Sequence, residues 1–543
     1  MKSFTISLIL LVSVAASISR TNSEGSTLSA QPDDSPHRRY VDCSAAVNGD
    51  GTKGSPWNTL SSPNAFNFGP GDQLLLRRGT TCQGTLFPPG SGSSDAPIII
   101  DAYGVGPQPV IDGGYNEEAL LLSDQQYWDI RNLEIIGGYQ YGIYIWGEKP
   151  ETTLNHFHLI NLNLHDAHYV TTTFDDSAEV EIQTNGLHEL INDVVIDGVT
   201  THDSHVASGI WVDSSGAYYQ ATNACIANAD QLLGNGVAIQ NSSAYNLDGS
   251  GIWLLNAKNG LIQGNVVHNI GITAGYDDAG ITEHCCHRCT VQYNESYTAH
   301  TPNNYPGGGF DIDTYNVDNT FQYNYGHDSD GGCIESFSDV GAPNTHTVVR
   351  YNICSNNNRL ATVPVGDFWL TTFYGASVNG LQIYNNVFYW NPATNAAALD
   401  VQYVQYSGTN PNFFKNNIIY STSPAMINAN SGITLDNNIY WNIGSSAPTW
   451  EVDSFTYTGF ASYQSGTGED AHSHYTDPLL NDPTYHGTVR PTTPFTLQRG
   501  SPARGAGANV CTGIPSCSMG KRDFFGNPLP NGSGYDIGAQ QAP

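Results

Sequence analysis

Basic residues are scarce in this chain of 543 residues, which has 19 Lys and Arg against 50 Asp and Glu and a formal net charge of −31 at pH 7. Such a surface repels nucleic acid, anionic lipid and polyanionic glycans unless a local patch or a bound cation intervenes. Between Lys149 and Lys415, the only fixed positive charges are Lys258, Arg288, Arg350 and Arg359. We therefore expect no nucleic-acid or membrane partner, and a neutral or weakly charged ligand.

Long apolar runs are also scarce. No stretch after the N-terminus reaches the roughly 18 apolar residues that suggest a membrane-spanning helix. At the N-terminus, Lys2 precedes an apolar stretch over residues 4–16, and small residues around 16–19 offer a cleavage site. This is the pattern of a secretory signal. We expect residues 1–19 to be a signal peptide, residues 20–40 to be a flexible linker or pro-segment, and the protein to be secreted.

A helical pattern, with apolar residues every three to four positions, is missing as well. Instead, short apolar segments are repeatedly punctuated by an asparagine: Asn265, Asn294, Asn324, Asn352, Asn386, Asn417 and Asn438. The steps between them are 29, 30, 28, 34, 31 and 21 residues. A sandwich of hairpins, the alternative, would repeat about every 8–12 residues. The longer period predicts an all-β parallel solenoid in which each Asn side chain bonds its turn and stacks on its copies.

The same pattern divides the chain into segments. We expect residues 41–110, which are rich in turns, to form an N-terminal cap and the first coils. Residues 111–445 should form the parallel β-helix with its groove, walled by the long inserts around 171–190 and 215–235. Residues 446–543, rich in Pro, Gly and Ser, should form the C-terminal coils and a cap over the open sheet edge.

Ten cysteines in an exported chain indicate disulfides. We expect the pairs Cys43–Cys82, Cys333–Cys354 and Cys511–Cys517. Residues 284–289, with two His and three Cys, also permit a zinc site. The alternative is disulfides to Cys225 or to neighbouring coils. Three glycosylation sequons occur, at Asn241, Asn294 and Asn531.

A second repeat is acidic. The segments 278–283 and 330–335 each begin with Asp and end with Glu, and Asp311 and Asp313 lie between them. Side chains alternate along a strand, so Phe310 and Ile312 should face the core and the two aspartates solvent. Coils stack about 4.8 Å apart. We therefore expect one outward cluster of six carboxylates, although the neighbouring glycines permit a bulge that would change the register of the glutamates: Asp278, Glu283, Asp311, Asp313, Asp330 and Glu335.

Two reactions use such a cluster. In glycoside hydrolysis, one carboxyl group protonates the leaving oxygen and a second acts as nucleophile or activates water. In β-elimination, carboxylates hold Ca²⁺ against a uronate while Lys or Arg takes the proton. Only Lys258 and Arg288 are near enough in sequence to be that base. Hydrolysis is favoured, with Asp313 and Glu335 as the first pair and Asp278, Asp311, Asp330 and Glu283 in reserve. A non-catalytic cluster, solvated or binding a structural Ca²⁺, is the third interpretation.

Aromatic and imidazole groups accompany the acids. Trp211 and Trp253 should occupy the outward position in the coils just before the cluster, and Tyr276 and Tyr315 lie in loops around it. Flat rings beside a groove stack on sugar faces. We expect these four residues to bind substrate, together with Asp213, His284 and His327. No cofactor is expected beyond possible Ca²⁺ at the cluster.

Several motifs resemble one known group of proteins: residues 49–57 (Gly-Asp-Gly-Thr…Pro-Trp), 69–72 (Gly-Pro-Gly-Asp), 321–332, 495–507 and 536–539 (Asp-Ile-Gly-Ala). The chain is similar to the secreted, right-handed parallel β-helix (pectate-lyase-like) superfamily of polysaccharide-active proteins. This resemblance covers nearly the whole mature chain. It implies a right-handed β-helix and a polysaccharide or oligosaccharide substrate. It does not decide the reaction, because the superfamily includes lyases, hydrolases and epimerases.

The motifs that mark polygalacturonases, Asn-Thr-Asp and Gly-His-Gly, are missing. Taken together, these observations predict a secreted, monomeric glycoside hydrolase acting on a neutral or weakly charged polysaccharide. A Ca²⁺-dependent polysaccharide lyase is the alternative enzyme. A glycan-binding surface protein without activity is the alternative that is not an enzyme.

Overall fold

The computed structural model describes residues 37–542 except 170–176, 186–188, 216–229, 274–277, 303–306, 339–343, 361, 363, 374, 516 and 531–533. The expected signal peptide, Tyr276, Cys225 and the sequon at Asn531 therefore lie outside the described residues. Within the described ranges, no helix is both long enough and apolar enough to span a bilayer.

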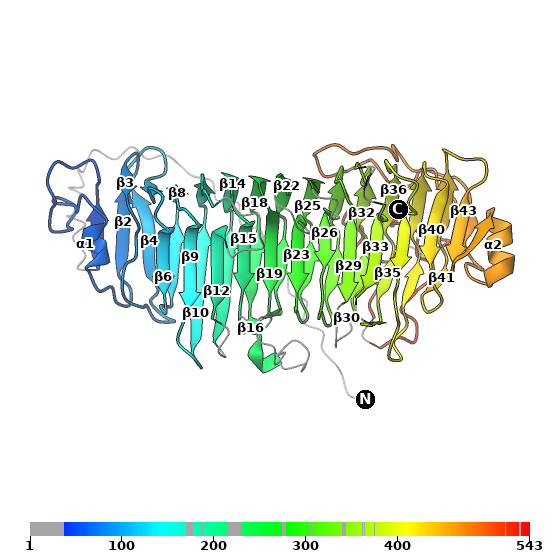
Figure 1. Cartoon of the computed structure of the whole chain (residues 1–543), viewed down its shortest axis with the longest axis horizontal. Coiled ribbons are helices and arrows are strands. Elements are labelled where there is room, and N and C mark those ends of the chain that lie inside the picture. The colour runs from blue at the N-terminus through cyan, green and yellow to red at the C-terminus, as the bar shows by residue number, and fades with distance from the viewer. Residues whose placement is uncertain are drawn as a thin grey trace, which may run out of the picture. The chain divides into compact units, whose positions relative to one another are not determined.

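Three long sheets of parallel strands run side by side along the unit His37–Pro543 (Figure 1). Each coil of the chain contributes one strand to each sheet in turn, so neighbouring strands of a sheet are about one coil apart in sequence. The expected right-handed, single-stranded parallel β-helix is confirmed. The interior is filled by inward-facing Ile, Leu, Val and Phe side chains from all three sheets.

The first sheet contains β1 (Arg38–Val41), β2 (Gln73–Arg77), β4 (Ile98–Tyr103), β7 (Trp128–Arg131), β10 (Thr153–Ile160), β13 (Leu190–Asp197), β17 (Val237–Gln240), β21 (Leu261–Gln263), β24 (Thr290–Gln292), β27 (Thr320–Gln322), β31 (Val348–Arg350), β35 (Gln382–Tyr384), β38 (Phe413–Lys415) and β41 (Thr434–Asp436).

The second sheet contains β3 (Thr81–Gln83), β5 (Val110–Asp112), β8 (Glu134–Ile136), β11 (Asn163–His165), β14 (Thr200–Ser204), β18 (Ser243–Leu247), β22 (Val266–Ile270), β25 (Glu295–Ala299), β28 (Tyr325–His327), β32 (Ile353–Ser355), β36 (Val387–Trp390), β39 (Ile418–Ser421), β42 (Ile439–Asn442) and β45 (His474–Tyr475).

The third sheet contains β6 (Glu118–Ser123), β9 (Tyr141–Gly147), β12 (Ala178–Thr184), β15 (Ser208–Asp213), β19 (Ser250–Leu255), β23 (Ile281–His284), β26 (Phe310–Ile312), β29 (Ile334–Ser338), β33 (Phe368–Thr372), β37 (Leu399–Gln402), β40 (Ala425–Ala429), β43 (Thr449–Val452) and β44 (Phe455–Thr458). Two short pairs stand apart, β16 (Gly234–Asn235) with β20 (Ala257–Lys258) and β30 (Asn344–Thr345) with β34 (Val378–Asn379). The helical elements among the described residues are α1 (Ser61–Asn64), η1 (Asp230–Leu232) and α2 (Phe460–Thr467).

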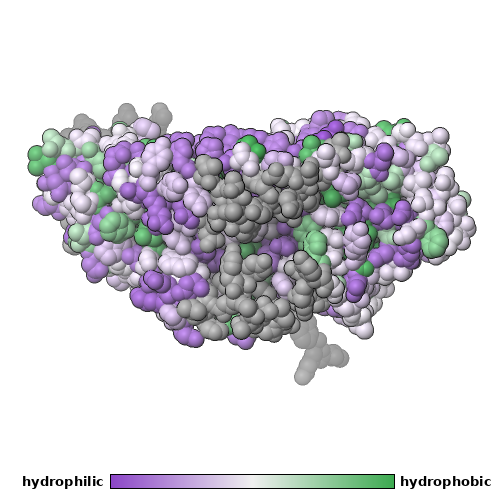
Figure 2. All heavy atoms as spheres, in the orientation of Figure 1, coloured by the Kyte–Doolittle hydropathy of each residue, from purple (hydrophilic) through white to green (hydrophobic). Residues whose placement is uncertain are grey.

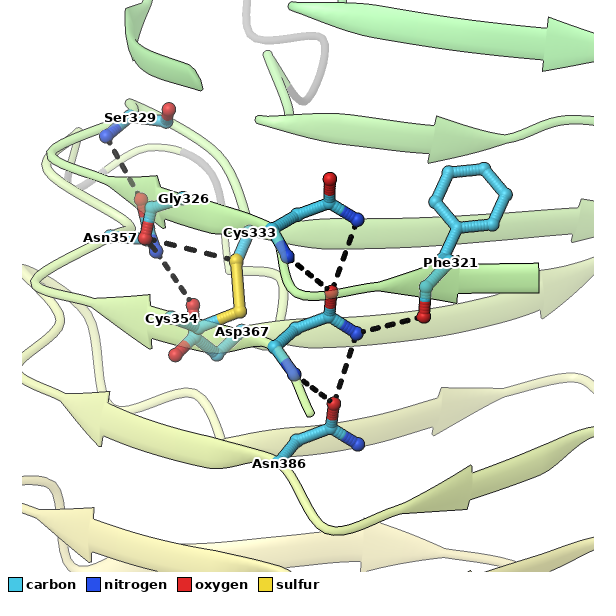
Figure 3. The surroundings of a disulfide bond; sticks show 10 residues. Phe321, Gly326, Ser329, Cys333, Cys354, Asn357, Asp367 and Asn386 are labelled. Atoms are coloured by element: carbon cyan, nitrogen blue, oxygen red, sulfur yellow. Dashed lines mark hydrogen bonds between the residues drawn. A yellow bond between two sulfur atoms is a disulfide. The ribbon is translucent and has the colours of Figure 1, made fainter. Parts of the chain in front are cut away.

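The seven asparagines of the repeat form one buried ladder between the first and second sheets. Along most of the ladder, each side-chain NH₂ donates to the carboxamide oxygen of the Asn in the next coil, at 3.0 or 3.1 Å. The last contact differs, because the backbone N–H of Asn417 donates to Asn438 at 2.9 Å. The same NH₂ groups donate to strand carbonyls, as Asn352 does to Phe321 (Figure 3). The predicted stacking of Asn side chains is confirmed.

The three expected disulfides are confirmed: Cys43–Cys82, Cys333–Cys354 and Cys511–Cys517. Figure 3 shows Cys333–Cys354 beside Asp367, whose Oδ1 accepts a hydrogen bond from Asn357. Burial raises the pKa of Asp367 to about 8. Cys285 is also disulfide-bonded, whereas Cys286 and Cys289 are buried free thiols.

The residues after β43 lie in two places. The strand β44 pairs antiparallel with β43 at the end of the third sheet, and α2 follows it directly. The chain then runs back along the outside of earlier coils. Asn385 donates to the carbonyls of Asp536 and Gly538, and the Tyr325 hydroxyl donates to that of Gly487. The described C-terminal residues therefore lie partly at the end of the third sheet and partly along earlier coils.

Candidate active site

Two rows of outward side chains run along the third sheet, across neighbouring coils. The strand register defines the first row as Leu121, Tyr144, Glu181, Trp211, Trp253, Thr282, Asp311, Glu335, Trp369, Asp400, Asn428 and Glu451. The second row lies two residues further along the chain and includes Asp213, Leu255, His284, Phe337 and, just past the end of β26, Asp313. The face of the unit that carries this sheet shows hydrophobic residues scattered among hydrophilic ones (Figure 2).

Asp311 and Glu335 are direct partners in the first row, on the adjacent strands β26 and β29. Both are largely buried, with exposed fractions of 7% for Asp311 and 1% for Glu335. The carboxyl group of Glu335 lies directly over the backbone of Gly308: a Cβ built on Gly308 would be 2.6 Å from its Cδ and 2.7 Å from its Oε1. Glycine at position 308 therefore provides the space that this carboxyl group occupies.

Asp313, which the sequence paired with Glu335, lies in the second row. Its Oδ2 is 2.8 Å from Nδ1 of His284, on the neighbouring strand β23, and its Oδ1 accepts from the backbone N–H of Thr314. The Tyr315 ring meets His284 edge-on at 5.7 Å between ring centroids. Asp313, His284 and Tyr315 thus form a second polar group beside the Asp311–Glu335 pair.

Glu283 is not in the outward cluster, which corrects its expected position. It pairs in register with Leu254 and Ile312, both of which face the core. It is fully buried, and its Oε1 accepts from Nδ2 of Asn319 at 2.8 Å. Burial raises the pKa of Glu283 well above its ordinary value. A carboxyl group in this position is part of the interior and does not reach a ligand on the outer face.

A one-residue offset explains this error. Ile281, Phe310 and Ile334 are register partners, so Thr282, rather than Glu283, corresponds to Glu335. The segment from Asp330 to the strand residue Ile334 is one residue longer than the segment from Asp278 to the equivalent strand residue Ile281. Two segments with the same Asp-to-Glu spacing therefore enter the sheet in different registers, and side chains of period two then face opposite sides.

Asp278 and Asp330 lie in the turns that lead from the second sheet into the third. Asp278 Oδ1 accepts from the Ser250 hydroxyl at 3.2 Å. Asp330 Oδ2 is 3.3 Å from Nδ1 of His300 and from the backbone N of Thr301. Asp330 lines a cavity of about 600 Å³ together with Asn269, Ile272, His300, Thr301, Pro302, Leu360 and Thr362. These two acids flank the strands and do not belong to either row.

Trp211 and Trp253 occupy the outward positions that were expected, and their rings stack at 5.0 Å with 8° between planes. Their exposed fractions are only 1% and 8%, so they are covered rather than open platforms. Asp213 is also buried, and its Oδ1 accepts from Nδ2 of Asn256 at 2.6 Å.

Trp369 was missed by the sequence reasoning. It is the first-row partner of Glu335 in the next coil, it is half-buried, and its indole N–H has no hydrogen-bond partner among the described residues. The sequence does contain a pattern that could have identified Trp369. Gly366 and Phe368 stand three residues and one residue before it, as Gly308 and Phe310 do before Asp311.

Beyond Trp369 the first row continues with polar residues that were also missed. Asp400, Asn428 and Glu451 line a cavity of about 250 Å³, and Asn428 and Glu451 also line another of about 410 Å³. Burial, aided by the charge of Glu451, raises the pKa of Asp400 to about 6 against its hydrogen bonds from Gln402 and Asn428. The row therefore extends as a polar surface past the acidic pair.

His327 does not border the acidic pair, because it belongs to β28 in the second sheet. It is fully buried within a stack of rings from six coils: His165, His202, Tyr245, His268, Tyr297 and His327. Burial alone would lower its pKa, but hydrogen bonds to Asp328 and Glu295 outweigh this effect, so the pKa is raised. Its environment is that of a structural ladder.

Neither expected base lies in an outward row. Lys258 donates to the carbonyl of Asp230, and Arg288 pairs with the Asp230 carboxylate at 2.7 Å. The described strands of the third sheet contain no Lys or Arg at all. A proton acceptor of the kind expected for a lyase is thus missing from the described part of this sheet.

If Glu335 is a catalytic group, replacing Gly308 by Ala should lower kcat about 10–100-fold, because the new methyl group displaces the Glu335 carboxyl group and small misplacements of such a group are costly. KM should change little, since the methyl group removes no substrate contact. Steady-state kinetics on a cleaved glycan would measure this. Gly54→Ala is the matched control, because a Cβ there meets no atom within 4 Å. An unchanged kcat in Gly308→Ala would separate Glu335 from the reaction.

No family model and no curated protein matches this sequence. Among solved structures, the native GH136 lacto-N-biosidase from Eubacterium ramulus matches with 19% identity and a TM-score of 0.49, covering 77% of this chain and 68% of that one. Pectate lyase Pel9A matches with 14% identity and a TM-score of 0.39, covering 93% and 97% of the two chains. An alginate lyase from Paenibacillus sp. str. FPU-7 matches with 17% identity and a TM-score of 0.37, covering 59% and 95%. At these identities the likeness is one of fold alone.

Proposed function

We propose that this protein is a carbohydrate-active enzyme, a glycoside hydrolase that cleaves a neutral or weakly charged polysaccharide with Asp311 and Glu335. One observation carries this proposal. The two carboxylates are direct register partners on the outer face of the third sheet, within a row that also contains Trp253 and Trp369. Acid pairs beside aromatic rings are suited to protonating a glycosidic oxygen while a sugar ring stacks nearby.

The register of the pair favours a retaining reaction. The backbones of partner strands lie about 4.8 Å apart, so the two side chains start from about that separation. Retaining glycosidases hold their carboxyl groups about 5–5.5 Å apart, whereas inverting enzymes need about 6.5–9.5 Å to admit a water molecule. One carboxylate would attack the anomeric carbon while the other protonates the leaving oxygen. Water, deprotonated by the second residue, would then release the sugar from its covalent ester.

The surroundings of the pair favour hydrolysis over β-elimination. The Lys or Arg base expected for elimination from a uronate is missing from the described strands of the third sheet, whose histidine, His284, lies in the second row. A uronate would also be repelled, because the first row includes Glu181, Asp400 and Glu451 besides the pair itself. A neutral sugar chain avoids this repulsion and can use Asn428 and Gln402 as hydrogen-bond partners.

We also propose that the protein is secreted and acts outside the cell. Three disulfides among the described residues indicate an oxidising compartment, as in secreted proteins. Together with the N-terminal signal pattern, they support extracellular action on a polymer outside the cell.

A polysaccharide panel with product masses tests the proposal. The purified chain should release oligosaccharides from a neutral polymer, with a mass gain of one water per bond cleaved. Products with no added water that absorb in the ultraviolet, formed only from uronate polymers and lost with EDTA, would show a lyase. Glycan binding without any cleavage would show a binding protein.

A further inference from the structure

Two histidines and two aspartates meet on the outer face of the first sheet, on a different sheet from the Asp311–Glu335 pair. Asp129 lies on β7, His156 and His158 lie on β10, and Asp193 lies on β13, so the cluster joins three adjacent coils. Asp129 is buried, His156 and His158 keep side-chain exposures of 18% and 22%, and Asp193 is exposed. We propose that this cluster binds one divalent transition-metal ion of the zinc type.

The distances around Asp129 are those of metal ligands. Its Oδ1 lies 3.1 Å from Nε2 of His156 and 3.5 Å from Nδ1 of His158. Tetrahedral Zn²⁺ with bonds near 2.0–2.1 Å holds its ligand atoms about 3.3 Å apart. Donor atoms of Asp129, His156 and His158 all lie within 4.8 Å of one another. These three side chains would ligate the ion, and water would complete the tetrahedron.

Asp193 supplies the outer carboxylate that such sites use. Its two oxygens face the other ring nitrogens of the two histidines, at 2.8 Å from Nδ1 of His156 and 3.4 Å from Nε2 of His158. A metal-bound histidine commonly donates its second N–H to a carboxylate, which fixes the ring and strengthens it as a ligand. One carboxylate does this for both rings here.

The hydrogen-bonding capacity of the rings points to a cation between them. Every ring nitrogen of both histidines faces a carboxylate oxygen, yet a neutral imidazole has only one N–H to donate. The two rings lie 3.8 Å apart between centroids and are tilted by 37°. Two neutral rings leave two ring nitrogens facing carboxylate oxygens with no N–H between them, and a metal ion on the Asp129 side would bind those nitrogen lone pairs.

The backbone conformation also brings the side chains of this cluster together. His156 and Asp193 face each other across β10 and β13, and both have a positive φ, of 67° and 55°. A histidine in the left-handed region is uncommon and costs energy. Here it turns the His156 ring onto the outer face beside His158. An ion bound by three coils would stabilise the fold and need not take part in catalysis.

Nitrogen and carboxylate ligands in a four-coordinate site suit Zn²⁺ better than Ca²⁺ or Mg²⁺, which prefer oxygen ligands in larger number. Calorimetric titration of the untagged, EDTA-treated protein with ZnCl₂ should give one saturable site, and CaCl₂ should give none there. Arg131 pairs with the second oxygen of Asp129. It therefore competes with the metal ion for the carboxylate charge and should limit the affinity for Zn²⁺.

Variants locate the site. His156→Asn with His158→Gln should abolish the Zn²⁺ isotherm, and Asn is chosen because it tolerates the left-handed backbone. Asp193→Asn keeps both rings and should weaken binding about 10–100-fold. His346→Asn removes a surface His–Asp contact of 2.9 Å at a position that also has a positive φ, of 56°, and is the matched control, with unchanged binding. Circular dichroism verifies the fold of each variant. The proposal is overturned if wild type binds no Zn²⁺, or if a folded double variant binds it as tightly.

Discussion

Replacing Glu335 by Gln or Asp311 by Asn should lower kcat by about 10²–10⁴-fold each, the usual range for removing a positioned proton donor or acceptor. Both replacements keep the size of the side chain, so the third sheet and its substrate contacts should remain intact. KM should therefore change much less than kcat. Steady-state kinetics on the polymer identified by the panel measures both constants.

The same variants separate the two roles. A substrate with a good leaving group needs no proton donor, so the acid variant should recover its first step on such a substrate and the nucleophile variant should not. Glu451→Gln, in the same row four strands beyond Glu335, is the matched control and should keep most of its activity. If Asp311→Asn stayed active while Asp313→Asn lost activity, the chemistry would belong to the Asp313–His284 group instead.

Replacing Asn352 by Ala should lower the free energy of unfolding by about 3–5 kcal/mol. The Asn352 oxygen accepts from the backbone N–H and the NH₂ of Asn324, and its NH₂ donates to Phe321 and to Asn386 (Figure 3). All these partners are buried, so the truncation leaves donors and an acceptor unsatisfied away from water. A buried polar group left without a partner costs about 1–3 kcal/mol.

Equilibrium urea denaturation of wild type and variant measures this loss. Asn395→Ala is the matched control, because Asn395 is exposed and should change stability by no more than about 0.5 kcal/mol. A loss below about 1 kcal/mol in Asn352→Ala would mean that the ladder follows from the coil and does little to stabilise it.

The Asn repeat could be found in the sequence because the contacts of each Asn in the ladder lie within about one coil of it. Each Asn of the ladder bonds a turn next to itself and its copy one coil away, so the same residue type must return at every turn from Asn265 to Asn438. The disulfide Cys333–Cys354 was predictable for a similar reason, since its cysteines are 21 residues apart, close to one coil. Both features depend on chain distance, which the sequence contains.

The identity of the acidic pair depended on register, which the sequence does not contain. One extra residue between Asp330 and Ile334 shifts the strand, so Asp311 meets Glu335 while Glu283 turns into the core. Side chains alternate with a period of two, so a slip of one residue exchanges inside for outside. The sequence alone determined the coil, its ladder and the presence of acids on one wall. Only the packing of one coil on the next decided which of those acids face each other.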